Sequence, residues 1–244
     1  MTAIDSSKGD LRIEDFVAEF LTIRNGRATT YEPREDSFLM LEALAELSLR
    51  GLRVLDMGTG SGILAAYCAR RGADVTASDI DIEAIRALEL TTDRMGTSIK
   101  LVTCDLFSKI HERFDIIAFN PPYLPSSTIG DRTTDGGNHG TEVISRFLGE
   151  LAQHLVENGR GMLVVSSLND PERLMMRHPS LSFKTVRERS LFFEKLYVLE
   201  AKARQASSSL IPYTHIWTAQ QVCAHAPCKP PDSLTSPNTC GCVS

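Results

Sequence analysis

A short apolar run that stops at two consecutive prolines places the strongest constraint on the fold of this chain. Residues 114–119 are apolar except for Asp115, and Asn120-Pro121-Pro122-Tyr123 follows directly. Such a run is typical of a parallel strand that is buried on both faces. Because prolines cannot continue the hydrogen-bond ladder, the strand must end at Asn120. We therefore expect Asn120 at the carboxyl end of a buried parallel strand, where open α/β sheets bind their ligands.

A glycine-rich turn follows an earlier predicted strand at residues 53–57. Gly58, Gly60 and Gly62 separate this strand from a helix that is predicted to run through residue 70. Glycine allows the backbone to turn tightly and to approach a ligand closely. The spacing Gly-x-Gly-x-Gly departs from the dinucleotide pattern Gly-x-Gly-x-x-Gly, so the turn by itself is weak evidence for any one ligand.

Four predicted strands end in, or close to, an acidic or amide side chain. These side chains are Asp56 beside the glycines, Asp79 after residues 74–78, Asp105 after residues 99–103, and Asn120. Placed at one edge of a sheet, they describe a pocket for a ligand rich in amines and hydroxyls. Asp79 lies about twenty residues past the glycines, where a carboxylate holds a ribose diol. The alternative for Asp79 is the N-cap of the next helix, a role for which Asp81 competes.

The remaining pattern predicts helices and a closing hairpin. Helices are predicted at residues 11–23, 38–47, 143–155 and 170–177, and further strands at residues 162–166, 182–188 and 193–200. The close connection of the last two strands favours an antiparallel hairpin at the sheet edge. Gly159 is predicted as the left-handed cap of the helix before it. The glycine-rich residues 124–140 are predicted to form a loop of the kind that covers a site.

The composition is that of an ordinary globular domain. The chain has 244 residues, 42% hydrophobic and 23% charged, with a formal net charge of -5. The negative charge disfavours a protein that grips a nucleic-acid backbone over many phosphates. The sequence has neither an apolar stretch of membrane-spanning length nor a hydrophobic signal core at its start. We therefore expect a soluble cytoplasmic protein with no membrane contact.

The domain is predicted at residues 1–203, followed by a flexible tail at residues 204–244. Cys68 and Cys104 fall inside predicted core elements, and nothing demands a disulfide framework. The tail carries soft side chains that can bind zinc: Cys223, Cys228, Cys240, Cys242, His215 and His225. Their spacing lacks the paired Cys-x-x-Cys arrangement of zinc sites, so we predict a flexible tail without a metal site.

Taken together, residues 54–62, Asp79, Asp105 and Asn120-Pro121-Pro122-Tyr123 resemble the class I S-adenosylmethionine-dependent methyltransferases, and specifically the HemK/PrmC family. The segments at residues 31–38, 135–140 and 193–199 are similar to its short archaeal and eukaryotic branch, which lacks the amino-terminal helical domain. The resemblance spans about residues 28–202. It implies an α/β, Rossmann-like fold: a mostly parallel seven-stranded sheet with an antiparallel carboxyl-terminal hairpin strand and helices on both faces.

The resemblance also implies an activity and its partners. The activity is transfer of a methyl group from S-adenosyl-L-methionine to the glutamine side chain of the Gly-Gly-Gln motif in a class I peptide-chain release factor. A small zinc-ribbon activator is implied at the edge of the third strand, where it would cap Ile99, Leu101 and Val102. The cofactor-binding roles implied are those of Ser37, Asp56, Gly58, Gly60, Asp79 at the ribose, Asp105 and Leu106 at the adenine, and Asn120.

The chemistry explains why such a site needs the Asn-Pro-Pro-Tyr sequence. An amide nitrogen is a poor nucleophile, so positioning must supply most of the rate enhancement. The Asn120 side-chain oxygen and the Pro121 carbonyl would each accept one of the two amide hydrogens. Tyr123 would stack on the flat amide, and Pro121 and Pro122 would keep Asn120 from relaxing.

Other acceptors and roles remain open at this point. An exocyclic adenine amine is also planar and conjugated, so N6-adenine methylation is the closest competitor, although it requires a base-flipping surface. A protein lysine is a further alternative, and its amine would have to be neutral. Two further alternatives are a non-catalytic binding module and a simple turn at the two prolines. Neither would give the intact tetrapeptide a chemical role.

Overall fold

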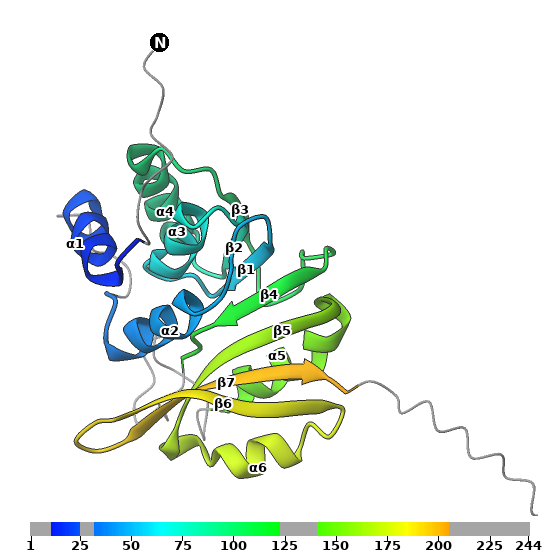
Figure 1. Cartoon of the computed structure of the whole chain (residues 1–244). Coiled ribbons are helices and arrows are strands. Elements are labelled where there is room, and N and C mark those ends of the chain that lie inside the picture. Colours follow the sequence, from blue (N-terminus) through cyan, green and yellow to red (C-terminus); the bar gives the residue numbers. More distant parts are fainter. Residues whose placement is uncertain (1–10, 25–31, 123–140, 205–244) are drawn as a thin grey trace, which may run out of the picture. The chain divides into compact units, whose positions relative to one another are not determined.

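A computed structural model of the chain describes residues 11–24, 32–122 and 141–204 (Figure 1). Its centre is a sheet with the strand order β3-β2-β1-β4-β5-β7-β6. The strands are β1 (Arg53–Met57), β2 (Asp74–Asp79), β3 (Lys100–Thr103), β4 (Phe114–Phe119), β5 (Leu155–Ser166), β6 (Leu181–Ser190) and β7 (Lys195–Ala203). The helices are α1 (Ile13–Arg24), α2 (Glu35–Ala45), α3 (Ile63–Arg70), α4 (Ile82–Met95), α5 (Glu142–His154), the 3-10 turn η1 (Ser167–Asn169) and α6 (Pro171–Met176).

The sheet confirms the predicted architecture. Strands β3, β2, β1, β4 and β5 run parallel, whereas β7 runs antiparallel to both β5 and β6. The predicted hairpin therefore forms, with β6 at the sheet edge and β7 inserted between β6 and β5. No helix in the described part of the chain combines the length and the apolar character needed to cross a bilayer.

Alternating strand residues divide the core into two layers, one on each face of the sheet. Val54 and Ile116 pack with the buried side chains of α1, α2 and α3. Leu55 and Ile117, the next residues along the same strands, pack with those of α5. Because both faces of β1 and β4 are covered, these strands read as continuous apolar runs in the sequence.

The prediction of a left-handed cap at Gly159 is wrong. Helix α5 ends at His154, and β5 begins at the next residue, seven positions before the predicted start at Met162. Asn158 takes the positive φ of 65°, while Gly159 lies inside β5. A Cβ on Gly159 would lie 2.9 Å from the Phe114 carbonyl oxygen, so this glycine serves a close approach of two backbones.

Candidate functional site

The carboxyl ends of four parallel strands bring the predicted polar side chains to one edge of the sheet. Asp56, the fourth residue of β1, is level with Ala118 of β4, so Asn120 lies just beyond the end of β1. Asp79 closes β2 and is level with Thr103, two residues before Asp105. The prediction that these strand ends meet at a common edge is confirmed.

Asp56 is buried beneath the glycine turn, with 1% of its surface exposed. Its Oδ2 accepts hydrogen bonds from Thr59 Oγ1 at 2.6 Å and from the Ala65 amide at 3.1 Å. These bonds tie the end of β1 to the glycine turn and to the first turn of α3. Burial raises the pKa of this carboxyl group to about 7.

Asp79 ties the second strand to the same turn. Its Oδ2 accepts from the Gly60 amide and its Oδ1 from the Asp81 amide, each at 2.9 Å. Burial raises the pKa of Asp79 above its ordinary value, and the two amide bonds partly oppose that rise. The N-cap of α4 is Asp81, whose side chain accepts from the Glu83 amide, so the N-cap alternative for Asp79 is not the one adopted.

Asp105 and Leu106 begin the loop after β3. Asp105 Oδ2 accepts from Arg146 Nη2 of α5 at 2.7 Å, and nearly half of the Asp105 side chain is exposed. Leu106 is buried and has a positive φ of 45°, a conformation that is uncommon for a residue with a side chain. The sequence pattern does not predict Arg146 as a site residue, because the helical periodicity around it does not indicate a partner far away in the chain.

Asn120 contacts the start of α2 through its side-chain amide. Asn120 Nδ2 donates to Ser37 Oγ at 3.5 Å, and the Ser37 hydroxyl donates to Asp36 Oδ1 at 3.2 Å. The Asp36 oxygen also accepts from the Ser37 amide at 2.6 Å. Asp36 and Ser37 are buried, at 4% and 3% exposure. These hydrogen bonds connect the Asn120 amide to the start of α2 through Ser37 and Asp36. Asp36 is a member that the sequence pattern did not indicate.

The other end of the Asn120 amide is an acceptor without a donor. Asn120 Oδ1 is buried and makes no hydrogen bond with any described residue. Buried acceptors are nearly always satisfied in folded proteins, so an unsatisfied one at a strand end indicates a place for a ligand donor. Pro121 is buried beside it, while Tyr123 and the predicted lid at residues 124–140 lie outside the described residues.

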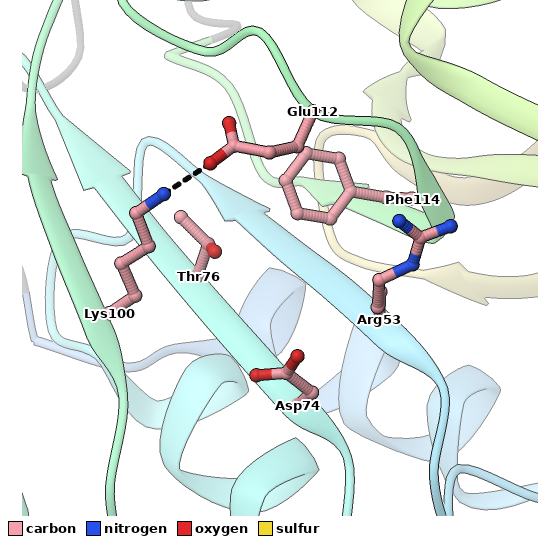
Figure 2. Close-up of a pocket in the computed structure, with 6 residues that line it drawn as sticks. All are labelled: Arg53, Asp74, Thr76, Lys100, Glu112 and Phe114. Carbon is pink, nitrogen blue, oxygen red and sulfur yellow. Dashed lines mark hydrogen bonds and ion pairs between the residues drawn. The ribbon is translucent and has the colours of Figure 1, made fainter.

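A separate pocket lies at the opposite edge of the sheet (Figure 2). Its lining includes the first residues of four strands: Arg53, Asp74, Lys100 and Phe114. Lys100 and Glu112 form an ion pair across its mouth. Because strand amino ends line it, this pocket is not part of the site around Asn120. The described residues contain no group of three His, Cys, Asp or Glu side chains arranged to bind a metal.

The sequence of this chain is similar to those of known methyltransferases. The family model described as "Methyltransferase small domain" matches residues 34–192. A putative protein N5-glutamine methyltransferase of Methanocaldococcus jannaschii is 33% identical over 180 residues, covering 70% of this chain and 90% of that protein. The human methyltransferase HEMK2 is 33% identical over 196 residues, covering 72% of this chain and 91% of that protein.

Structural comparison gives the same picture. The E. cuniculi Mtq2-Trm112 complex, described as responsible for methylation of the translation termination factor eRF1, matches with a TM-score of 0.60 and 29% identity. That match covers 71% of this chain and 98% of the other. A Thermus thermophilus 16S rRNA N2 G1207 methyltransferase in complex with AdoMet and guanosine matches with a TM-score of 0.58 and 26% identity, covering 73% and 45% of the two chains.

Proposed function

Because the chain belongs to the methyltransferase small domain family, we propose that it methylates the side-chain amide of a glutamine in a class I peptide-chain release factor, using S-adenosylmethionine. The relatives named as glutamine methyltransferases and the Mtq2-Trm112 complex support this acceptor. The observation that carries the proposal is the unsatisfied Asn120 Oδ1. It is an acceptor placed to receive one hydrogen of a substrate NH2 group at the end of β4.

The residues at the site fit the proposed cofactor. S-adenosylmethionine supplies an electrophilic methyl group on a positively charged sulfur. Gly58 and Gly60 would allow the backbone to approach its amino-acid part closely, and the Asp79 carboxylate would accept from the ribose hydroxyls. Asp105 and Leu106 would hold the adenine. Asp56 is almost fully buried, so we assign it the task of holding the glycine turn in place.

Catalysis in this proposal depends on positioning the acceptor nitrogen. Asn120 Oδ1 and the Pro121 carbonyl oxygen accept the two amide hydrogens, which builds electron density on the nitrogen and fixes its direction. Orientation of this kind contributes about 7 to 11 kcal/mol in favourable cases. Pro121 and Pro122 hold the backbone rigid. Tyr123 lies outside the described residues, and its stacking on the amide plane stays a prediction from the sequence. A strong base is not required, since the proton can leave to solvent after the transfer.

We also propose a small zinc-ribbon activator at the free edge of β3. Within the described sheet this strand pairs with β2 on one side only, and its edge position leaves backbone groups without a strand partner there. Leu101 and Val102 are half-buried in the described structure, so a covering protein would remove apolar surface from water. The Trm112 chain of the E. cuniculi complex supports a partner of this kind. We further propose that the enzyme acts in the cytoplasm, together with its release factor substrate.

The test is methyl transfer from labelled cofactor, with and without the activator, to the release factor, histone and DNA in parallel. We expect label on the glutamine of the Gly-Gly-Gln motif, located by mass spectrometry. Asn120→Ala should still bind the cofactor and lose nearly all turnover, because the side-chain oxygen that accepts from the substrate amide is removed. Label on DNA or on lysine, or full activity in Asn120→Ala, would contradict the proposal.

A further inference from the structure

The tip of the β6–β7 hairpin carries two aromatic side chains that the fold leaves in solvent. Phe192 and Phe193 are 91% and 86% exposed, the highest values among the exposed large hydrophobic residues of the described chain. Their rings pack edge to face, with centroids 4.6 Å apart. Single exposed hydrophobic residues are common, but two adjacent exposed rings form a patch of the kind that binds another molecule.

The strand register places this tip at the same edge of the sheet as Asn120. Phe119 is level with Leu163 of β5, and Ser166, three residues further on, is level with Leu196 of β7. Strands lie about 4.8 Å apart and rise about 3.3 Å per residue, so the tip lies roughly 20 Å from Asn120. An ordinary protein interface covers about 800 Å² on each partner, a patch roughly 30 Å across, which is wide enough to include both.

The hairpin is attached to the helix that contacts Asn120. Arg189 Nη2 pairs with Glu42 Oε1 at 2.6 Å, and Arg189 Nη1 donates to the Glu35 carbonyl oxygen at 3.5 Å. Glu35 begins α2, two residues before Ser37, the hydrogen-bond partner of Asn120. Figure 1 shows the rounded end of the hairpin on the side of the sheet to which the β4 arrow points. The tip is therefore held in position relative to the site.

Charge favours a protein over a nucleic acid as the molecule that covers this tip. The two basic side chains that flank it are already paired: Arg189 with Glu42, and Lys195 with Glu188 at 2.8 Å. These carboxylates offset the positive charge of both side chains, whereas nucleic-acid binding depends on unpaired cations at the phosphates. The two rings also pack edge to face, so they do not present two parallel faces on which bases could stack.

We propose that Phe192 and Phe193 dock the body of the protein substrate while its acceptor glutamine lies at Asn120. This inference rests on the proposed function, since it takes the substrate to be a folded protein. The two rings contribute to substrate affinity and make no contact with the reacting atoms. Their removal should therefore raise KM for the intact release factor and leave kcat nearly unchanged.

The test compares wild-type protein with the double variant Phe192→Ser/Phe193→Ser, each with the activator bound. Met176→Ser is the matched control, because Met176 is also a large exposed side chain, 73% exposed, on α6. We expect the double variant to raise KM for the release factor about tenfold, within the range of interface aromatic residues. The control should keep the wild-type KM, and all three proteins should bind S-adenosylmethionine equally, which shows that the site is folded.

The other outcomes separate the docking proposal from the proposed function. An unchanged KM in an active double variant overturns the docking role and leaves glutamine methylation standing. Loss of activator binding in the double variant, seen as separate elution on a sizing column, assigns the tip to the activator and overturns the proposal. Loss of self-association by the double variant assigns the tip to a second copy of the chain, with the same consequence. Methylation of DNA by the wild-type protein, weakened in the double variant, overturns both proposals.

Discussion

Replacing Gly62 with alanine should destabilise the fold much more than the same change at Gly96. Both glycines have positive φ, 82° at Gly62 and 62° at Gly96, so both variants pay the cost of a left-handed alanine. That cost is about 1–2 kcal/mol, and the reduced freedom of the unfolded chain offsets about 0.4–1 kcal/mol of it. Gly96→Ala should therefore lower the free energy of unfolding by roughly 1 kcal/mol.

Gly62→Ala carries an additional steric cost. A Cβ there would lie 2.4 Å from Leu88 Cδ1 and 3.1 Å from Leu88 Cγ, whereas nothing lies within 4 Å of a Cβ on Gly96. Leu88 is 0% exposed, so its side chain has no open space to move into. Overpacking of a filled core costs about 1–3 kcal/mol, which brings the expected total for Gly62→Ala to roughly 2–4 kcal/mol.

Urea denaturation of the two variants measures this difference directly. The double variant Gly62→Ala/Leu88→Ala removes the clash, so adding Gly62→Ala to Leu88→Ala should cost only about 1 kcal/mol, as at Gly96. Equal destabilisation by Gly62→Ala and Gly96→Ala, or no coupling between Gly62 and Leu88, would refute the steric argument. Because Gly62 precedes α3 at the end of the glycine turn, Gly62→Ala should also weaken binding of S-adenosylmethionine.

Two further predictions concern the buried polar groups. The pKa of Asp56 is about 7 in the folded chain against an ordinary value of 3.8, so the folded state holds the proton more tightly. The free energy of unfolding should then fall by about 3 kcal/mol from pH 5 to pH 8, and Asp56→Asn should flatten this slope in urea titrations at the two pH values. Equal pH dependence in the wild-type protein and in Asp56→Asn would contradict the assignment of the raised pKa to Asp56. Ser37→Ala removes the hydroxyl that accepts from Asn120, so kcat should fall about fivefold with cofactor affinity unchanged, while Ser37→Thr keeps most of the rate. A weaker cofactor affinity in Ser37→Ala would instead indicate direct cofactor contact.

The sequence pattern was sufficient to predict the strand ends of the site. Asp79 ends the buried strand β2 and Asn120 follows the buried strand β4, and parallel strands place such ends along one edge. The contacts among the side chains could not be predicted in the same way. Asn120 meets Ser37 across 83 residues of chain, and Arg146 meets Asp105 across 41. These pairs depend on how α2 and α5 pack on the sheet, which periodicity does not reveal.

Tertiary contacts at Gly159 override the usual preference of a glycine at that position. Local sequence alone predicts a left-handed cap at Gly159, because glycine is the common residue there. A glycine is needed there instead because the carbonyl oxygen of Phe114, on a strand far away in the sequence, leaves no space for a Cβ. Tyr123, the loop at residues 124–140 and residues 205–244 of the predicted tail lie outside the described residues, and their roles stay predictions.

The insertion of β7 between β5 and β6 has a consequence for biosynthesis. While the chain emerges in order, β5 and then β6 are made before the strand that separates them. Until residues 195–203 arrive, β5 keeps an open apolar edge and β6 has no neighbour with which to pair. A nascent chain interrupted in this interval would therefore expose an aggregation-prone edge, and premature stop codons before residue 195 should yield insoluble products.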